Sequence, residues 1–167
     1  SNLGYMAQKF SLYGNLTLRQ NLEFFASVYG INFLNKDKRV DEIIDIFNFH
    51  DIQDMKSQDL PLGFKQRLSL ACAVIHNPPI LFLDEPTSGV DVIARREFWN
   101  HITSLAKLGV TILVTTHFMN EAEYCNRISL FYKGETIALG TPYELKTKAK
   151  ADNMEQAFVN LIKESGK

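Results

Sequence analysis

Residues 80–86 read Ile-Leu-Phe-Leu-Asp-Glu-Pro, four apolar residues followed directly by two carboxylates. A short continuous apolar run is typical of a strand buried on both faces of a parallel sheet. The carboxylates then lie at the C-terminal end of the strand, where open α/β sheets bind their ligands. In phosphoryl transfer an aspartate placed in this way can hold Mg²⁺, and a neighbouring acid can polarise the attacking water. We therefore expect Asp84 to bind the metal and Glu85 to be the base, although this short stretch alone is equally consistent with a solvated turn.

A second apolar run, residues 110–116 (Val-Thr-Ile-Leu-Val-Thr-Thr), predicts another central parallel strand. Between the two runs, residues 98–105 carry apolar side chains at helical spacing, and Gly109 follows as a stop. Strand, helix and strand in this order predict a crossover and hence an α/β fold. His117 comes directly after the second strand and can reach a γ-phosphate at the same edge of the sheet, although a lone histidine is more often structural.

Residues up to about 76 are predicted to be helical and to form a small lobe. Residues 17–20 (Thr-Leu-Arg-Gln) have the form of a capping box, and the helix that they begin is expected to stop at Gly30. Apolar residues at helical spacing predict a second helix over residues 40–47 and a third over 64–75, which a pair of prolines terminates.

The C-terminal part is predicted to contain a hairpin and two helices. Residues 128–132 and 136–139 flank Lys133-Gly134, which indicates a hairpin. Thr141 begins a capped helix with a proline in its first turn, and residues 154–162 are amphipathic. By motif content we divide the chain into residues 1–76, 77–150 and 151–167.

Composition sets broad limits on this chain. Its 167 residues are 46% hydrophobic, which is enough for one compact domain. Its 18 basic and 19 acidic residues leave a formal charge of −1, so bulk charge gives no indication of a nucleic-acid partner or an anionic membrane. There is no apolar run of about 18 residues, and Cys72 and Cys125 lack metal or redox spacing. We expect a soluble chain in a reducing setting, and Ser1-Asn2 is interpreted as an expression remnant.

Two further segments have both a chemical and a structural interpretation. Residues 60–67 (Leu-Pro-Leu-Gly-Phe-Lys-Gln-Arg) precede the third predicted helix, and Gly63 there either lets a phosphate approach backbone N–H groups or relieves a tight turn. Residues 88–91 (Ser-Gly-Val-Asp) form a polar turn, in which Asp91 is also suited to cap the next helix.

Five motifs stand in the order found in ABC ATPases, and the chain resembles this family from Gln8 to its final helix. Residues 5–9 resemble the Q-loop, 60–67 the signature segment, 80–85 the Walker B motif, 88–91 the D-loop and His117 the switch histidine. The resemblance implies an α/β fold, namely a partial P-loop NTPase (ABC ATPase) core with a helical subdomain. Residues 115–123 and 138–142 are similar to ATPases of ABC-2-type bacterial exporters.

The resemblance also implies roles, cofactors and partners. Gln8 would contact the metal or the attacking water and couple the site to a membrane subunit, and catalysis would use Glu85, His117 and Gln8. Mg²⁺ would be held by Asp84 and Gln8. ATP would be bound by Gln8, Leu60, Pro61, Leu62, Gly63, Phe64, Asp84, Glu85, Ser88, Gly89, Asp91 and His117.

The implied partners are a transmembrane permease subunit and a second ATPase domain in a head-to-tail dimer, with Asp91 at the dimer contact. The signature segment would complete the ATP site of the opposite domain. The expected location is the cytoplasmic face of the membrane, and no nucleic-acid partner is expected. The transported substrate is not specified by any of these motifs.

The sequence departs from the family pattern in two places. It contains neither the adenine-stacking aromatic nor the GxxGxGK[ST] phosphate loop that precede the Q-loop, so we expect a truncated subunit, or a chain that borrows this loop from a partner, and little ATP binding by the chain alone. Pro61 and Leu62 stand where the family usually has serine and glycine, which predicts an altered, asymmetric pair of ATP sites. Two alternatives stay open: a soluble ABC ATPase without a membrane partner, and a non-catalytic interaction module.

Overall fold

The computed structural model describes residues 2–9 and 12–164, so Ser1 of the predicted expression remnant lies outside the described part. The chain forms two compact units, residues 1–115 and 116–167, each of which is described by itself. The division into residues 1–76, 77–150 and 151–167 follows motif content and stays a prediction. In the described part, no helix has both the length and the apolar character needed to cross a membrane.

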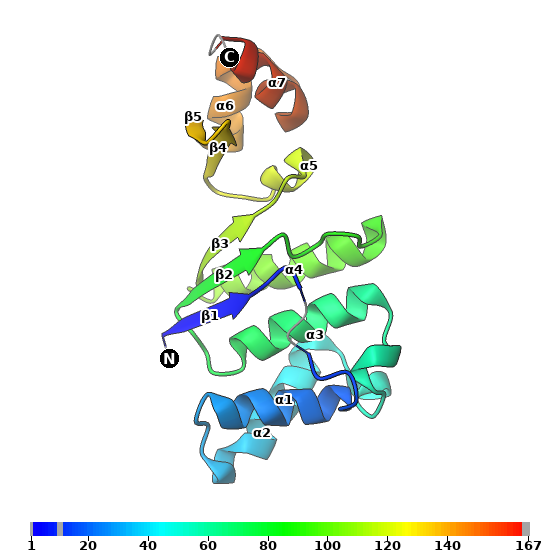
Figure 1. Cartoon of the computed structure of the whole chain (residues 1–167). Coiled ribbons are helices and arrows are strands. Elements are labelled where there is room, and N and C mark those ends of the chain that lie inside the picture. The colour runs from blue at the N-terminus through cyan, green and yellow to red at the C-terminus, as the bar shows by residue number, and fades with distance from the viewer. Residues whose placement is uncertain (1, 10–11, 165–167) are drawn as a thin grey trace. The chain divides into compact units, whose positions relative to one another are not determined.

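The first unit is built on a three-stranded parallel sheet in the order β1-β2-β3 (Figure 1). Its strands are β1 (Leu3–Met6), β2 (Ile80–Asp84) and β3 (Thr111–Thr115). The predicted α/β fold is confirmed. The sequence prediction did not include β1, because four residues with a glycine among them are too short to show a strand period.

The helices of the first unit confirm those predicted from sequence. They are α1 (Leu18–Val28), α2 (Phe33–Phe47), α3 (Leu62–Val74) and α4 (Val92–Lys107), with 3-10 turns η1 (His50–Ile52) and η2 (Ser57–Asp59). The predicted capping box is present, since the Thr17 hydroxyl accepts from the Gln20 N–H and the Gln20 side chain accepts from the Thr17 N–H. The helical lobe is α1, α2 and α3, whose shared core includes Leu22, Ile43, Ile44, Phe47 and Leu68.

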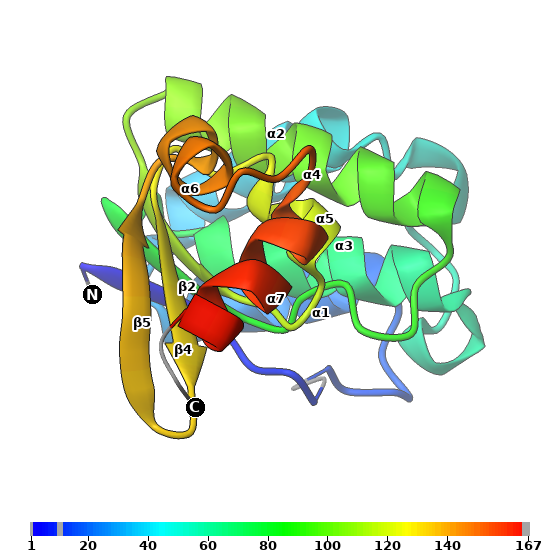
Figure 2. The ribbon, with the colours of Figure 1, turned by 90° about the horizontal axis from the view of Figure 1, so that it is seen from above.

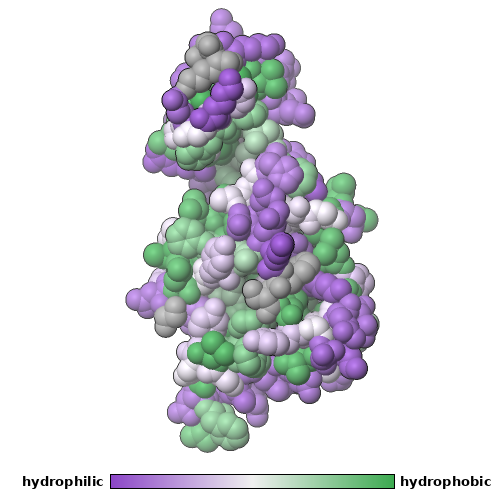
Figure 3. Space-filling model, in the orientation of Figure 1, coloured by the Kyte–Doolittle hydropathy of each residue, from purple (hydrophilic) through white to green (hydrophobic). Residues whose placement is uncertain are grey.

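The two faces of the sheet differ in burial, which corrects one prediction. Met6, Leu81 and Leu83 are buried on one face, where α3 approaches so closely that a Cβ on Gly4 would lie 2.5 Å from the Ala73 carbonyl oxygen. On the other face Tyr5 is 56% and Leu113 is 54% exposed. The prediction that both strand runs are central and buried on both faces is therefore wrong: β3 is the edge strand of the described sheet and is only half-buried. Figure 3 shows exposed hydrophobic residues over this part of the molecule.

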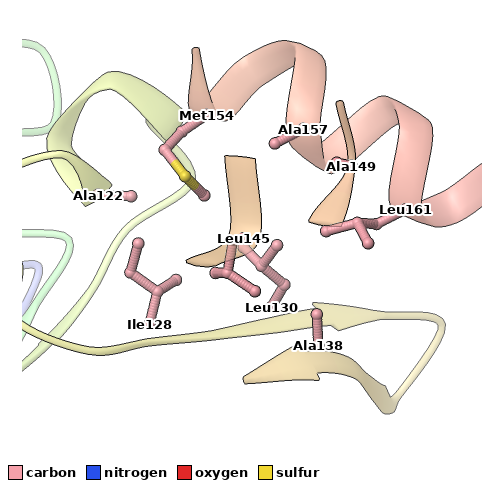
Figure 4. Close-up of a cluster of buried hydrophobic side chains, with 9 residues drawn as sticks. All are labelled: Ala122, Ile128, Leu130, Ala138, Leu145, Ala149, Met154, Ala157 and Leu161. Atoms are coloured by element: carbon pink, nitrogen blue, oxygen red, sulfur yellow. The ribbon is translucent and has the colours of Figure 1, made fainter. Parts of the chain in front are cut away.

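The second unit is a hairpin packed against three helices. Its elements are α5 (Met119–Ala122), β4 (Ile128–Tyr132), β5 (Glu135–Gly140), α6 (Pro142–Lys148) and α7 (Met154–Glu164). The predicted hairpin, the capped helix at Thr141 and the final helix are confirmed. Figures 2 and 4 show α6 and α7 beside the hairpin, with Leu130, Leu145 and Met154 among the buried residues between them.

Candidate functional site

The acidic pair lies at the C-terminal end of β2, where the parallel register places Asp84 opposite Thr115 of β3. The Thr115 hydroxyl donates to Asp84 Oδ1 at 2.5 Å. The same hydroxyl accepts from the backbone N–H of Glu85 at 3.3 Å. Both acidic residues are therefore connected to the same side chain on the neighbouring strand.

The backbone turns sharply at Glu85, where φ is 43°. This left-handed conformation is uncommon for a residue with a side chain and is often found at functional sites. The Glu85 N–H donates to the Thr115 carbonyl at 2.9 Å, and the Glu85 carbonyl accepts from the Ser88 N–H at 3.1 Å. These bonds hold the backbone of Glu85 in place, so that the chain leaves the sheet directly after Asp84.

Gln8 meets this pair from β1. It follows the end of β1 by two residues, and its Nε2 donates to Glu85 Oε2 at 2.9 Å. The two residues are 77 positions apart in sequence, and the parallel pairing of β1 with β2 brings them together. The first unit thus gathers Gln8, Asp84 and Glu85 at one edge of its sheet, and the catalytic and metal-binding roles given to them stay predictions.

The signature segment forms the beginning of α3. Pro61 is the N-cap residue and makes no side-chain capping bond. The N–H groups of Phe64 and Lys65 both donate to the Pro61 carbonyl, at 3.0 and 3.1 Å. Leu60 is buried and only 3% exposed, whereas Leu62 is 40% exposed. Of these two leucines, Leu62 is therefore open to solvent and Leu60 belongs to the core.

Gly63 has a steric role that the sequence left open. A Cβ at this position would lie 2.6 Å from the Ala94 Cβ, so only glycine lets the first turn of α3 approach α4 this closely. Gly89 has a φ of 74° and lies beside Leu62, since a Cβ on Gly89 would lie 3.4 Å from Leu62 Cδ2. The signature segment and the D-loop are therefore in direct contact within the first unit.

Asp91 is the N-cap of α4. Its Oδ1 accepts from the backbone N–H groups of Ile93 and Ala94 at 2.9 and 3.0 Å. The capping interpretation is therefore correct, and the role of Asp91 at a dimer contact stays a prediction. Ser88 lies in the turn before this cap, with its backbone N–H bonded to Glu85.

His117 belongs to the second unit and is exposed. Its ring centroid lies 4.1 Å from that of Phe118. The loop around it is held by Thr116, whose hydroxyl donates to the buried Glu121 carboxylate at 2.7 Å and accepts from the Phe118 N–H at 3.1 Å. The predicted site residues therefore fall into three groups. These are the acidic edge with Gln8, the signature segment with the D-loop, and His117 in the loop held by Thr116 and Glu121.

Thr115 is the residue that the sequence reasoning missed. It belongs to the apolar run of residues 110–116, but the sequence alone assigned no role to it. The register of β2 and β3 places Thr115 opposite Asp84, and the sequence does not give that register.

Within the described residues, no cluster of three or more histidine, cysteine or acidic side chains could enclose a metal ion. Mg²⁺ does not require such a cluster in phosphoryl transfer, because it keeps several waters and takes one or two carboxylates together with substrate phosphates. Asp84, with one oxygen bonded to Thr115, fits this requirement. Burial raises the pKa of both the Cys72 and the Cys125 thiols, and Glu121 adds to the effect at Cys125, so both are weak nucleophiles at neutral pH.

Comparisons with known proteins give the family of this chain. The family model described as ABC transporter matches residues 1–88. The chain is 56% identical over 166 residues to the probable multidrug ABC transporter ATP-binding protein YbhF of Escherichia coli (strain K12), covering 96% of this chain and 29% of that protein. It is 32% identical to the linearmycin resistance ATP-binding protein LnrL of Bacillus subtilis (strain 168), covering 98% of this chain and 53% of that protein.

A solved structure has the same fold. CbiO1 from Clostridium perfringens, part of the ABC transporter complex CbiONQ, superimposes with a TM-score of 0.79 at 26% identity, over 88% of this chain and 60% of that one. The chain spans less than two thirds of each of these three proteins. With a family match over more than half of its length, the chain belongs to the ABC transporter family.

Proposed function

We propose that this chain supplies the hydrolytic half of an ATP site in the ATP-binding subunit of an ABC exporter. The observation that carries the proposal is the polar network at the edge of the sheet, in which Gln8 is bonded to Glu85 at 2.9 Å and Thr115 to Asp84 at 2.5 Å. A glutamine, an aspartate and a glutamate at the ends of adjacent parallel strands are suited to position a metal ion and an attacking water.

In this proposal, Glu85 acts as the general base toward the water that attacks the γ-phosphate. The Gln8 amide, which donates to Glu85, holds the carboxylate in place and becomes a partner for the water. Asp84 and Gln8 would hold Mg²⁺, which would neutralise charge on the phosphates when bound. His117 would steady the transferred phosphoryl group from the loop supported by Thr116 and Glu121.

The proposed partners are a transmembrane permease subunit and a second ATPase domain, at the cytoplasmic face of a membrane. The names of YbhF, described as a probable multidrug ABC transporter protein, and LnrL, described as a linearmycin resistance protein, support export as the direction of transport. Co-purification of the full-length protein with an integral membrane protein tests this assignment. Recovery of the full-length protein without any membrane partner would favour a soluble ABC ATPase.

The 167 residues contain no GxxGxGK[ST] loop, and we propose that they do not bind ATP tightly by themselves. Hydrogen bonds to charged groups contribute about 1.5–3 kcal/mol each, so three missing ones would cost roughly 5–9 kcal/mol. That loss is comparable with the roughly 8 kcal/mol that a micromolar affinity represents.

Calorimetric titration with Mg-ATP, of this chain and of the full-length protein side by side, tests the proposal. We expect saturable binding to the full-length protein and no saturation with the chain alone. Stoichiometric binding to the chain alone would contradict the dependence on a phosphate loop. Absence of binding to the full-length protein would contradict the proposed function itself.

A further inference from the structure

The side chain of Thr115 connects the two acids of the proposed site. Its hydroxyl donates to Asp84 Oδ1 at 2.5 Å and accepts from the Glu85 N–H at 3.3 Å. Its carbonyl also accepts from the Glu85 N–H, at 2.9 Å. Thr115 is thus bonded both to Asp84, the proposed metal ligand at the end of β2, and to Glu85, the proposed general base that follows it.

The first of these bonds fixes the direction of the Asp84 side chain. A hydroxyl that donates to a carboxylate forms a short, charge-assisted bond, and such a bond restricts the rotation of the acid. With Oδ1 bonded to Thr115, Oδ2 is the oxygen left to face a metal ion. Partners that orient metal ligands in this way are a general feature of metal sites.

The second bond acts on the turn at Glu85. This residue has a φ of 43°, a conformation that persists only where the surrounding structure holds it. The two oxygen atoms of Thr115 share the Glu85 N–H and so hold that turn from the adjacent strand. The direction in which the general base leaves the sheet therefore depends on the same threonine.

We propose that Thr115 is a positioning residue for the proposed ATPase reaction, in which its hydroxyl orients Asp84 toward Mg²⁺ and holds Glu85 in its turn. This inference rests on the proposed function. It assigns to the hydroxyl group a role separate from the strand pairing, which uses only the backbone of Thr115.

The full-length protein carrying Thr115→Val tests the inference, because valine keeps the shape of threonine and the backbone carbonyl but lacks the hydroxyl. We expect kcat to fall and the Mg²⁺ concentration for half-maximal rate to rise. The ratio of kcat to that Mg²⁺ concentration should fall by about 10–100-fold. ATP affinity measured in EDTA should be unchanged, whereas the gain in affinity on adding Mg²⁺ should shrink. Thr115→Ser, which restores the hydroxyl, should recover most of both properties.

Thr111→Val is the matched control, since Thr111 lies on the same face of β3 at its other end and is exposed. It should leave kcat, the Mg²⁺ dependence and the melting temperature as they are. A Thr115→Val protein with an unchanged Mg²⁺ dependence and turnover would overturn the inference. Failure of Thr115→Ser to recover activity would do the same, because it would assign the effect to packing of the methyl group.

Glu85→Gln, measured in the same preparation, separates this inference from the proposed function. Loss of turnover in Glu85→Gln with normal turnover in Thr115→Val would overturn only the role of Thr115. Retained turnover in Glu85→Gln would remove Glu85 from the role of base, and the Mg²⁺ dependence of Thr115→Val would then decide the role of Thr115 toward Asp84 alone. A melting temperature measured without nucleotide or metal shows whether Thr115→Val is folded, and a folded variant that needs more Mg²⁺ for half-maximal rate supports the inference.

Discussion

The acidic edge of the sheet and the beginning of α3 are both expected to meet nucleotide phosphates, but they are held in place by different interactions. At the acidic edge, hydrogen bonds join Gln8 to Glu85 and Thr115 to Asp84. At the beginning of α3, the N-cap residue Pro61 makes no side-chain bond, and Gly63 is defined by its close packing on Ala94.

Because of this difference, the two regions should respond differently to amino-acid substitutions. Polar networks depend on the identity of each donor and acceptor, so a substitution that keeps the shape but removes a charge should affect chemistry more than folding. A close approach between two helices depends on volume, so an added methyl group should affect folding first. Substitutions in the two regions should therefore differ both in the property that changes and in the size of the change.

Glu85→Gln in the full-length protein should produce the largest effect. Glutamine has the same shape and still accepts a hydrogen bond from Gln8, but it does not accept a proton, and the loss of a general base is worth about 10²–10⁴-fold in rate. We expect turnover to fall by this factor while ATP binding is retained, as measured by phosphate release and by equilibrium titration. Glu155→Gln, at an exposed position of α7, is the control for loss of a single charge. Normal turnover in Glu85→Gln would remove this residue from the role of base.

Gly63→Ala should destabilise the fold, because the new Cβ would lie 2.6 Å from the Ala94 Cβ. Overpacking of this kind costs typically about 1–3 kcal/mol, and urea unfolding of the purified protein measures it. Gly14→Ala is a matched control, since its nearest contact would be an ordinary 3.4 Å to the side chain of Gln58. Combining Gly63→Ala with Ala94→Gly should recover part of the loss. If Gly63→Ala were as stable as the control, packing on α4 would not explain this glycine.

The pair of substitutions Pro61→Ser and Leu62→Gly tests whether the beginning of α3 limits the reaction. A serine would add a hydroxyl and a backbone N–H, and one hydrogen bond to a charged phosphate would raise turnover of the full-length protein by roughly 10-fold. For Pro61→Ser alone, a serine N-cap contributes about 1 kcal/mol and loss of proline removes about 0.4–1 kcal/mol, so this substitution should change stability little. Pro61→Ala, which restores the N–H without the hydroxyl, separates the two groups. Unchanged turnover in the double variant would count against the asymmetric pair of ATP sites that the sequence predicts.

The smallest effect concerns pH and the packing of α4 on the helical lobe. His101 stacks on Phe47 with ring centroids 4.6 Å apart, and its pKa is lowered mainly by burial and also by the nearby Arg67 guanidinium. Because the pKa is lower in the folded protein, the neutral ring favours folding above about pH 6.5, and that contribution is lost as the pH falls through the folded-state pKa.

We therefore expect the free energy of unfolding to decrease between pH 7 and pH 5, with His101 contributing at most about 1.4 kcal/mol per pH unit. His101→Phe should make this slope shallower while keeping a ring against Phe47. Some slope should persist, since burial also lowers the pKa of His76. An identical pH dependence in His101→Phe and the parent protein would exclude His101 as a contributor.

Local sequence signals determined most of the fold of this protein. The capping box at Thr17, the strand before Asp84, the stop at Gly109 and the hairpin around Lys133-Gly134 were all predicted, because each depends on residues close in sequence. The order of motifs along the chain also predicted the family and the place of the acidic pair Asp84 and Glu85. Strand β1 was missed because its four residues have no period of their own.

The tertiary structure decided what depends on neighbours distant in sequence. The burial of β3 follows from its place at the edge of the described sheet, and its apolar composition could not indicate that place. The bond from Gln8 to Glu85 spans 77 positions, and the contacts of Thr115 and of Gly63 depend on the register of two strands and on the distance between two helices. Local propensity selects helices and strands, but which side chains meet is settled only when those elements pack.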